Sequence, residues 1–201
     1  MVRAWIGSAL LVTTGIFFAA SAAAAEPTSP PRLAPEGEVL DDAGNFRPLS
    51  DFTRGRITLL GLINTRCAER PGCLRVTEVF REVRALLRAE SSLQTRVRLV
   101  SLSFDPVHDV PDVLASFGAQ SRAGARGADW YFVTTLSARR LAPILAGFGA
   151  ESPVADDAEP LPVYLLDPMG VVRAVYHAPR LSPRLIVDDI RALENEIAGK
   201  R

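Results

Sequence analysis

The sequence has few cysteine, histidine and lysine residues, which are frequent nucleophiles, proton carriers and metal ligands. Two cysteines, Cys67 and Cys73, and two histidines, His108 and His177, occur in 201 residues, and Lys200 is the single lysine. No Ser–His–Asp, zinc-ligand or phosphate-loop pattern is present. The 23 basic and 23 acidic residues balance to zero net charge, which argues against a nucleic-acid partner. Chemistry is therefore expected at the cysteine pair.

The N-terminal region has the pattern of an export signal. Arg3 supplies a positive charge, residues 4–20 are apolar and uncharged, and Ala23-Ala24-Ala25 offers small residues for cleavage. We therefore predict a signal peptide over residues 1–25 and a periplasmic protein, in a compartment where a dithiol can be oxidised. Because residues 4–25 are just long enough to span a bilayer, retention as an inner-membrane anchor is the alternative.

The rest of the chain is predicted to hold one domain. Residues 26–48 read as a proline-rich extended linker and N-terminal segment, with a hairpin-like stretch around residues 42–46. Within residues 49–201, short apolar runs alternate with stretches of helical periodicity. Strands are expected at 57–63, 97–104, 130–133, 163–166 and 171–176, and helices at 74–87, 110–117, 138–148 and 183–198. This order predicts an α/β, thioredoxin-like fold with a central mixed sheet, mainly parallel with a C-terminal antiparallel hairpin, flanked by helices.

Three aspartates border the predicted elements. Asp109 is placed to cap the helix that begins near residue 110, with Pro111 in its first turn. Asp105 follows a strand, where it could orient the cysteine loop, that is, residues 67–73, which carry Cys67 and Cys73. Asp167 is expected to cap the turn of the C-terminal hairpin.

The two cysteines lie between the end of a buried strand and the start of a helix. Free N–H groups and the helix dipole at such a junction favour a thiolate. A thiolate attacks disulfides or ligates a soft metal such as Cu(I), so Cys67 and Cys73 are candidate catalytic residues and candidate metal ligands. A structural disulfide is the third alternative, although a bridge across one turn stabilises a fold little.

Four short motifs occur in order along the domain. They are NTRC at residues 64–67, LVSLSFDPVHD at 99–109, WYFVT at 130–134 before a helix ending in Phe148-Gly149, and VYLLDPMG at 163–170. Together they resemble the Y-T-x-C, S-x-D-P-x-x-D, W-x-F-L-T-G and Y-L-(I/L)-D-P-x-G motifs of the Sco (SenC) family of copper chaperones for cytochrome c oxidase assembly. The resemblance extends from about residue 35 to residue 198. It implies a thioredoxin-like fold, copper, and an acceptor protein with copper-binding or redox-active cysteines.

The chain departs from that family in two places. The cysteine spacing is C-x5-C, whereas the family has C-x3-C. Counted back without gaps from residues 167–170, the family's copper-binding histidine falls on Glu159, a hard ligand that suits Cu(II) better than Cu(I). Glu159 is thus the candidate third metal ligand, whereas His108 is expected to be an exposed loop residue and His177 to end the last strand. Pro162 has a place like the cis-proline of thioredoxin-like redox proteins, which favours thiol–disulfide chemistry.

These observations lead to one expected function and two alternatives. We expect a Sco-like periplasmic protein that delivers copper to a respiratory oxidase or controls the redox state of its cysteines. The first alternative is a metal-independent thiol–disulfide oxidoreductase. The second is a binding module whose disulfide is structural.

Overall fold

The computed structural model describes residues 32–66, 71–124, 127–150, 161–177 and 181–199, without the side chains of residues 71–73. The predicted signal peptide, Cys67 and Glu159 lie outside the described residues. The elements in chain order are β1 (Arg32–Leu33), β2 (Glu38–Asp41), β3 (Phe46–Pro48), α1 (Ser50–Thr53), β4 (Ile57–Ile63), α2 (Pro71–Leu87), α3 (Ser91–Arg96), β5 (Val97–Ser103), α4 (Pro111–Ser121), β6 (Asp129–Thr134), α5 (Ala138–Phe148), β7 (Val163–Leu166), β8 (Val171–Tyr176) and α6 (Pro183–Gly199).

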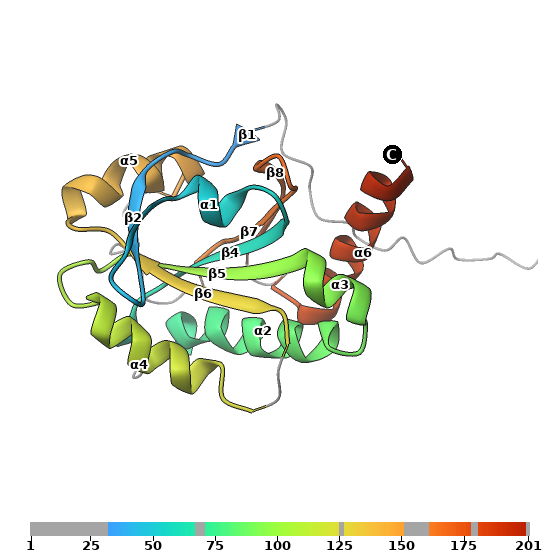
Figure 1. The fold of residues 1–201 in the computed structure, drawn as a ribbon, viewed down its shortest axis with the longest axis horizontal. Helices are drawn as coiled ribbons and strands as arrows, with labels where there is room; N and C mark the ends of the chain where they lie inside the picture. The colour runs from blue at the N-terminus through green and yellow to red at the C-terminus, as the bar shows by residue number, and fades with distance from the viewer. Residues whose placement is uncertain (1–31, 67–70, 125–126, 151–160, 178–180, 200–201) are drawn as a thin grey trace, which may run out of the picture.

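The strands form one sheet in the order β1-β8-β7-β4-β5-β6-β2-β3 (Figure 1). The central strands β4, β5 and β6 are parallel, and the strands on both sides of them are antiparallel. The predicted thioredoxin-like α/β class is confirmed. The antiparallel share is larger than expected, because β7 runs antiparallel to β4 and residues 32–48 add three further antiparallel strands.

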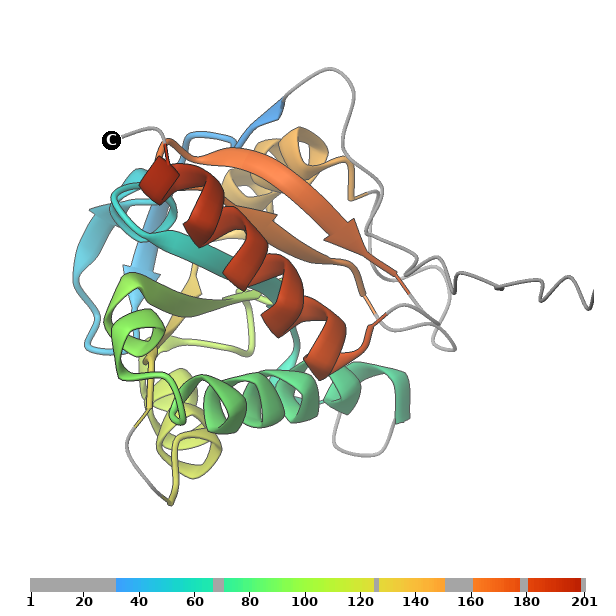
Figure 2. The same ribbon diagram turned by 90° about the vertical axis from the view of Figure 1, so that its right-hand side faces the viewer.

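The central strands are buried on both faces, which explains their continuous apolar sequences. Successive side chains of β4 point to opposite faces, so Leu59 joins one core cluster and Leu60 the other. The cluster of Leu59 includes residues of α2 and α6, and Figure 2 shows these two helices on the same side of the sheet. The cluster of Leu60 includes residues of α1 and α5. The sheet is thus the middle of three layers.

Residues 32–48, predicted as an extended segment, supply β1, β2 and β3. The expected hairpin is confirmed: β2 and β3 pair antiparallel, and Asp41 in their turn accepts hydrogen bonds from the N–H groups of Ala43 and Asn45 at 3.0 and 2.8 Å. β1 pairs with β8, and β2 pairs with β6. The sheet therefore includes residues on both sides of the boundary predicted at residues 48 and 49.

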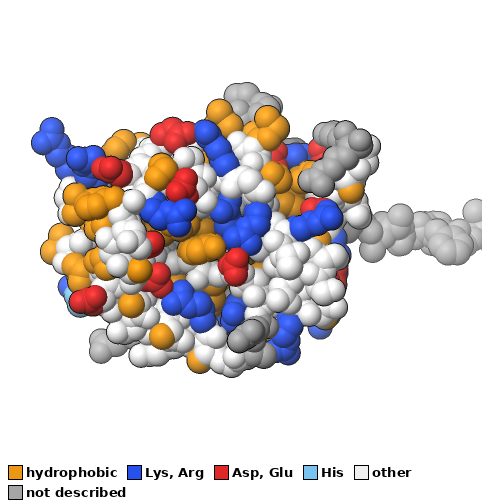
Figure 3. Space-filling view, in the orientation of Figure 1, with side chains coloured by type: hydrophobic (Ala, Val, Ile, Leu, Met, Phe, Trp, Pro, Cys, Tyr) orange, Lys and Arg blue, Asp and Glu red, His pale blue; other side chains and the backbone are white. Residues whose placement is uncertain are grey.

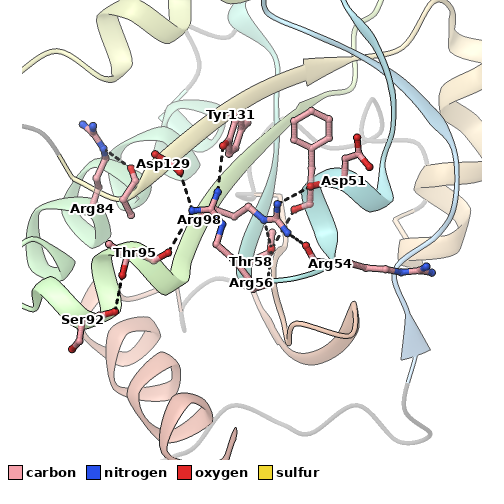
Figure 4. Close-up of polar contacts among 12 residues, drawn as sticks. Asp51, Arg54, Arg56, Thr58, Arg84, Ser92, Thr95, Arg98, Asp129 and Tyr131 are labelled. Atoms are coloured by element: carbon pink, nitrogen blue, oxygen red, sulfur yellow. Dashed lines mark hydrogen bonds and ion pairs between the residues drawn. The ribbon is translucent and has the colours of Figure 1, made fainter. Parts of the chain in front are cut away.

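A polar network closes the end of the sheet where the parallel strands begin (Figure 4). Arg98 in β5 is 5% exposed, and its guanidinium donates to the Thr58 hydroxyl at 3.0 Å, to the Asp51 carbonyl at 2.7 Å and to the Arg54 carbonyl. Burial is the main cause that lowers the pKa of Arg98 to about 10, so the group is charged at neutral pH. These bonds hold α1 against the sheet.

On the face drawn in Figure 3, basic and acidic side chains are interspersed.

Candidate functional site

The predicted site lies at the edge of the sheet where the parallel strands end. Ile63 and Ser103, the last residues of β4 and β5, are paired, and the Phe104 N–H donates to the Ile63 carbonyl at 3.0 Å. The segment 64–66 after β4 and the segment 104–109 after β5 therefore leave the sheet side by side. The first of these segments leads directly to Cys67.

The carboxylate of Asp109 holds the segment that precedes Cys67. Asp109 is fully buried, and one of its oxygens, Oδ2, accepts from the Thr65 N–H at 3.1 Å and from the Ser103 hydroxyl at 2.5 Å. The other oxygen, Oδ1, accepts from the Thr65 hydroxyl at 2.5 Å. The prediction that Asp109 caps α4 is therefore wrong: the N-cap is Val110, which has no side-chain cap bond. Asp109 stands one residue too early, and its carboxylate turns to Thr65.

Asp105 contacts the same segment at the surface. Its carboxylate accepts from Nε of Arg66 at 3.1 Å and also from Nη2, and Nδ2 of Asn64 lies 3.5 Å away. The Asp105 N–H donates to the Ser103 hydroxyl at 3.0 Å. Because the Arg66 side chain is 61% exposed, this ion pair contributes about 1 kcal/mol or less. Asp105 thus contacts Arg66, the residue before Cys67; that it orients the cysteine loop stays a prediction, because residues 67–70 lie outside the described residues.

The helix that follows the cysteine loop packs tightly on β4. A Cβ atom on Gly61 would lie 2.6 Å from Cγ1 of Val76 and 3.0 Å from Cζ of Phe80, so only glycine permits this approach without a shift. α2 begins at Pro71, three residues earlier than predicted. The backbone of Cys73 is therefore in the first turn of α2, where N–H groups have no partner within the helix and the helix dipole is positive.

The described residues leave the predicted metal ligands untested. They contain no group of three His, Cys, Asp or Glu side chains that could hold a metal ion. Cys67 and Glu159 lie outside them, as does the side chain of Cys73. The set Cys67, Cys73 and Glu159 stays a prediction.

The two histidines and Pro162 are described. His108 is exposed, as expected, in the turn after β5, where its N–H donates to the Asp105 carbonyl at 3.2 Å. His177 is exposed and follows β8. Because Tyr176 pairs with Val163, and Val163 with Gly61 of β4, His177 and Pro162 lie toward the edge of the sheet where β4 ends.

Burial shifts the pKa of two neighbouring groups, the Tyr176 hydroxyl at the end of β8 and the Asp189 carboxyl in α6. The Tyr176 hydroxyl donates to the carboxylate of Asp189 in α6 at 2.9 Å. Burial is the largest cause that raises the pKa of Tyr176, and it also raises the pKa of Asp189, against the opposing effect of that hydrogen bond. The Tyr176 side chain is fully buried, so this pair joins α6 to the sheet.

Comparisons with known proteins place the fold. No family model and no curated protein matches the chain. Among solved structures, BsSco, a member of the Sco family of cytochrome c oxidase assembly proteins, is 20% identical with a TM-score of 0.68, over 85% of this chain and 97% of that one. ScoI from Arabidopsis thaliana with copper bound is 14% identical with a TM-score of 0.65, over 82% and 99%. A SCO1/SenC family lipoprotein from Bacillus anthracis is 19% identical with a TM-score of 0.65, over 83% and 98%.

These likenesses define the class of fold. The chain has the thioredoxin-like α/β architecture, with one sheet between helices. More particularly, it has the fold of the Sco (SenC) structures over most of its length and nearly all of theirs. The resemblance inferred from the four motifs is confirmed at the level of the fold.

Proposed function

We propose that the chain is a Sco-like protein that handles copper, or the redox state of an acceptor's cysteines, in the maturation of a respiratory oxidase. One observation supports this most strongly. The fold is that of Sco proteins, among them one with copper bound; α2 begins at Pro71 with the Cys73 backbone in its first turn, and Thr65, two residues before Cys67, is held by Asp109. The described segments on either side of residues 67–70 thus support a site that combines both cysteines.

Two thiolates at this edge support both branches of the proposal. As soft ligands they would hold Cu(I) as cargo and release it to sulfur ligands of an acceptor protein. In the redox branch, one thiolate attacks the acceptor's disulfide and releases one acceptor thiolate; the second thiolate then attacks the resulting mixed disulfide and releases the other acceptor thiolate. Two electrons and two protons pass to the acceptor, whose cysteines are reduced while Cys67 and Cys73 become a disulfide.

Titration with Cu(I) tests the copper branch. We expect the fully reduced protein to bind one Cu(I), measured by competition with a coloured Cu(I) chelator, and Cys67→Ser and Cys73→Ser each to weaken binding sharply. Met169→Leu, which alters an exposed thioether on the opposite hairpin turn, is the matched control and leaves binding unchanged. Glu159→His should strengthen Cu(II) binding most, because imidazole suits that ion better than a carboxylate.

The same titration separates the rival functions. A reduced protein that binds copper in neither oxidation state contradicts the copper branch and leaves the metal-independent thiol–disulfide oxidoreductase. Thiols with the ordinary pKa of about 8.5 in each single-serine variant contradict the redox branch as well, because a helix N-terminus lowers a thiol pKa. A binding module with a structural disulfide is then the better account.

We also propose that the protein is exported to the periplasm. The pattern in residues 1–25 and the lipoprotein among the structural neighbours support this. None of the helices in the described part of the chain is long and apolar enough to cross a membrane. Mass spectrometry of the protein from the periplasmic fraction should give an N-terminus close to residue 26, whereas an intact N-terminus in the membrane fraction favours the anchor.

A further inference from the structure

Asp109 is a buried charge that the proposed chemistry does not use. Its carboxylate is fully buried and accepts three hydrogen bonds, all from neutral donors: the N–H and hydroxyl of Thr65 and the hydroxyl of Ser103. Among the described residues no cationic side chain forms an ion pair with it. A buried carboxylate held in this way is costly unless its bonds are maintained, so the arrangement demands a fixed geometry at Thr65.

The position of Asp109 is itself fixed by its own turn. Its N–H donates to the Asp105 carbonyl at 2.8 Å, and the Ser103 hydroxyl holds both the Asp109 carboxylate and the Asp105 N–H. Asp109 is therefore braced on β5, while its bonds to Thr65 act on the segment after β4. Thr65 is only two residues from Cys67.

We infer that Asp109 is a positioning residue, which sets the reactivity of the cysteine pair by fixing the backbone from which Cys67 departs. This inference rests on the proposed function only in assigning the chemistry to Cys67 and Cys73. Asp109 acts through Thr65, so its effect should follow the hydrogen bonds and not the negative charge.

The hydrogen-bond pattern provides a variant that separates bonds from charge. In Asp109→Asn, the amide oxygen can take the place of Oδ2 and accept from the Thr65 N–H and the Ser103 hydroxyl. The amide nitrogen then takes the place of Oδ1 and donates to the Thr65 hydroxyl, which is free to rotate. All three contacts survive and the charge is lost, whereas Asp109→Ala loses both.

A matched control exists at the other edge of the sheet. The Asp167 carboxylate accepts from the N–H groups of Met169 and Val171 at 2.9 and 3.1 Å in the turn between β7 and β8. Because Leu166 pairs with Thr58 near the start of β4, this turn lies at the edge opposite the end of β4 and Thr65. Asp167→Ala likewise removes N–H bonds to a carboxylate, together with a 3.5 Å ion pair to Arg173, at a place away from the cysteines.

The test measures the reduced protein's rate of reaction with an aromatic disulfide across a pH series, and the reduction potential of the cysteine pair against glutathione. We expect Asp109→Ala to change the rate about tenfold, while Asp109→Asn and Asp167→Ala stay within about twofold of the wild type. Thr65→Val, which removes one hydroxyl, should move the rate in the same direction as Asp109→Ala and by less. This milder variant decides the matter where Asp109→Ala does not fold.

Two results would overturn the inference. In the first, Asp109→Ala or, where it does not fold, Thr65→Val reacts like Asp167→Ala, which makes Asp109 a structural residue only. In the second, Asp109→Asn shifts the pH profile as far as Asp109→Ala, which assigns the effect to charge. No copper is used, so failure of the copper titration contradicts only the copper branch of the proposed function and leaves this measurement valid.

Discussion

Arg98 and Asp109 are buried charges near opposite ends of β5, and each is stabilised by dipoles. Arg98 donates to the carbonyls of Asp51 and Arg54 and to the Thr58 hydroxyl. Asp109 accepts from one N–H and two hydroxyls. Removing either side chain would leave buried or part-buried polar groups without these partners, which costs free energy of folding. Arg98 therefore holds the short helix α1, and Asp109 holds the segment after β4, against the sheet.

Arg98→Met is expected to lower the free energy of unfolding by about 2–4 kcal/mol, because the carbonyls of Asp51 and Arg54 lose their donor. Arg56→Met is the matched control. Arg56 is more exposed and its ion pair with Asp129, at 2.8 Å, should contribute only about 1 kcal/mol. Urea unfolding followed by circular dichroism measures both. Equal losses in the two variants would show that Arg98 stabilises α1 no more than a surface ion pair does.

At the scale of elements, α2 connects the cysteine loop to the core. Its close approach to β4 depends on Gly61, where a side chain would meet Val76 and Phe80. Val76 lies one turn after Cys73 on α2. The start of the helix, and with it the backbone of Cys73, is thus fixed by packing three residues further along.

Gly61→Ala is predicted to destabilise the protein by about 1–3 kcal/mol, because the added methyl group forces α2 away from β4. Gly199→Ala is the control, since nothing lies within 4 Å of a Cβ at that position. Thermal unfolding of both variants gives the comparison. An unchanged midpoint for Gly61→Ala would mean that α2 shifts without cost and that the packing does not fix the start of the helix.

Elements with strong local patterns could be predicted from the sequence, and those that depend on distant partners could not. Four elements have the predicted bounds: β4, α5, β7 and β8. Each has an unbroken local pattern, an apolar run or alternation in the strands and helical spacing of apolar residues in α5. Two of their boundaries also have clear local causes. Gly149 ends α5 in a left-handed conformation, and Asp167 caps the β7–β8 turn as predicted. α1 and α3 are short and polar and gave no periodic pattern.

The prediction that Asp109 caps α4 was also wrong because the actual partner of Asp109 is distant in the sequence. An aspartate before Val-Pro has the local pattern of a helix cap, and only the fold brings Thr65, 44 residues away, to its carboxylate. The strands β1 and β2 were likewise not expected in the sheet, because they pair with β8 and β6, which lie far along the chain. The cysteines could be singled out from the sequence because they are the two in the chain.

At the scale of the whole molecule, different polar networks stabilise the two ends of the parallel strands. Where these strands begin, the network of Arg98 fixes α1 and closes the sheet. Where they end, Asp105 and Asp109 anchor the segment that leads to Cys67, and α2 begins at the cysteine loop. The two ends of the parallel strands are thus held by separate polar networks, one around Arg98 and one around Asp109.

X-ray absorption at the copper edge of the Cu(I)-loaded protein tests the central claim most directly, because it counts the sulfur atoms bound to the metal. Our account predicts two sulfur ligands in the wild type and one in Cys73→Ser, since Cys67 and Cys73 are the two cysteines of the chain. A loaded wild type whose copper is bound only by nitrogen and oxygen, or whose spectrum is the same in Cys73→Ser, would contradict the account.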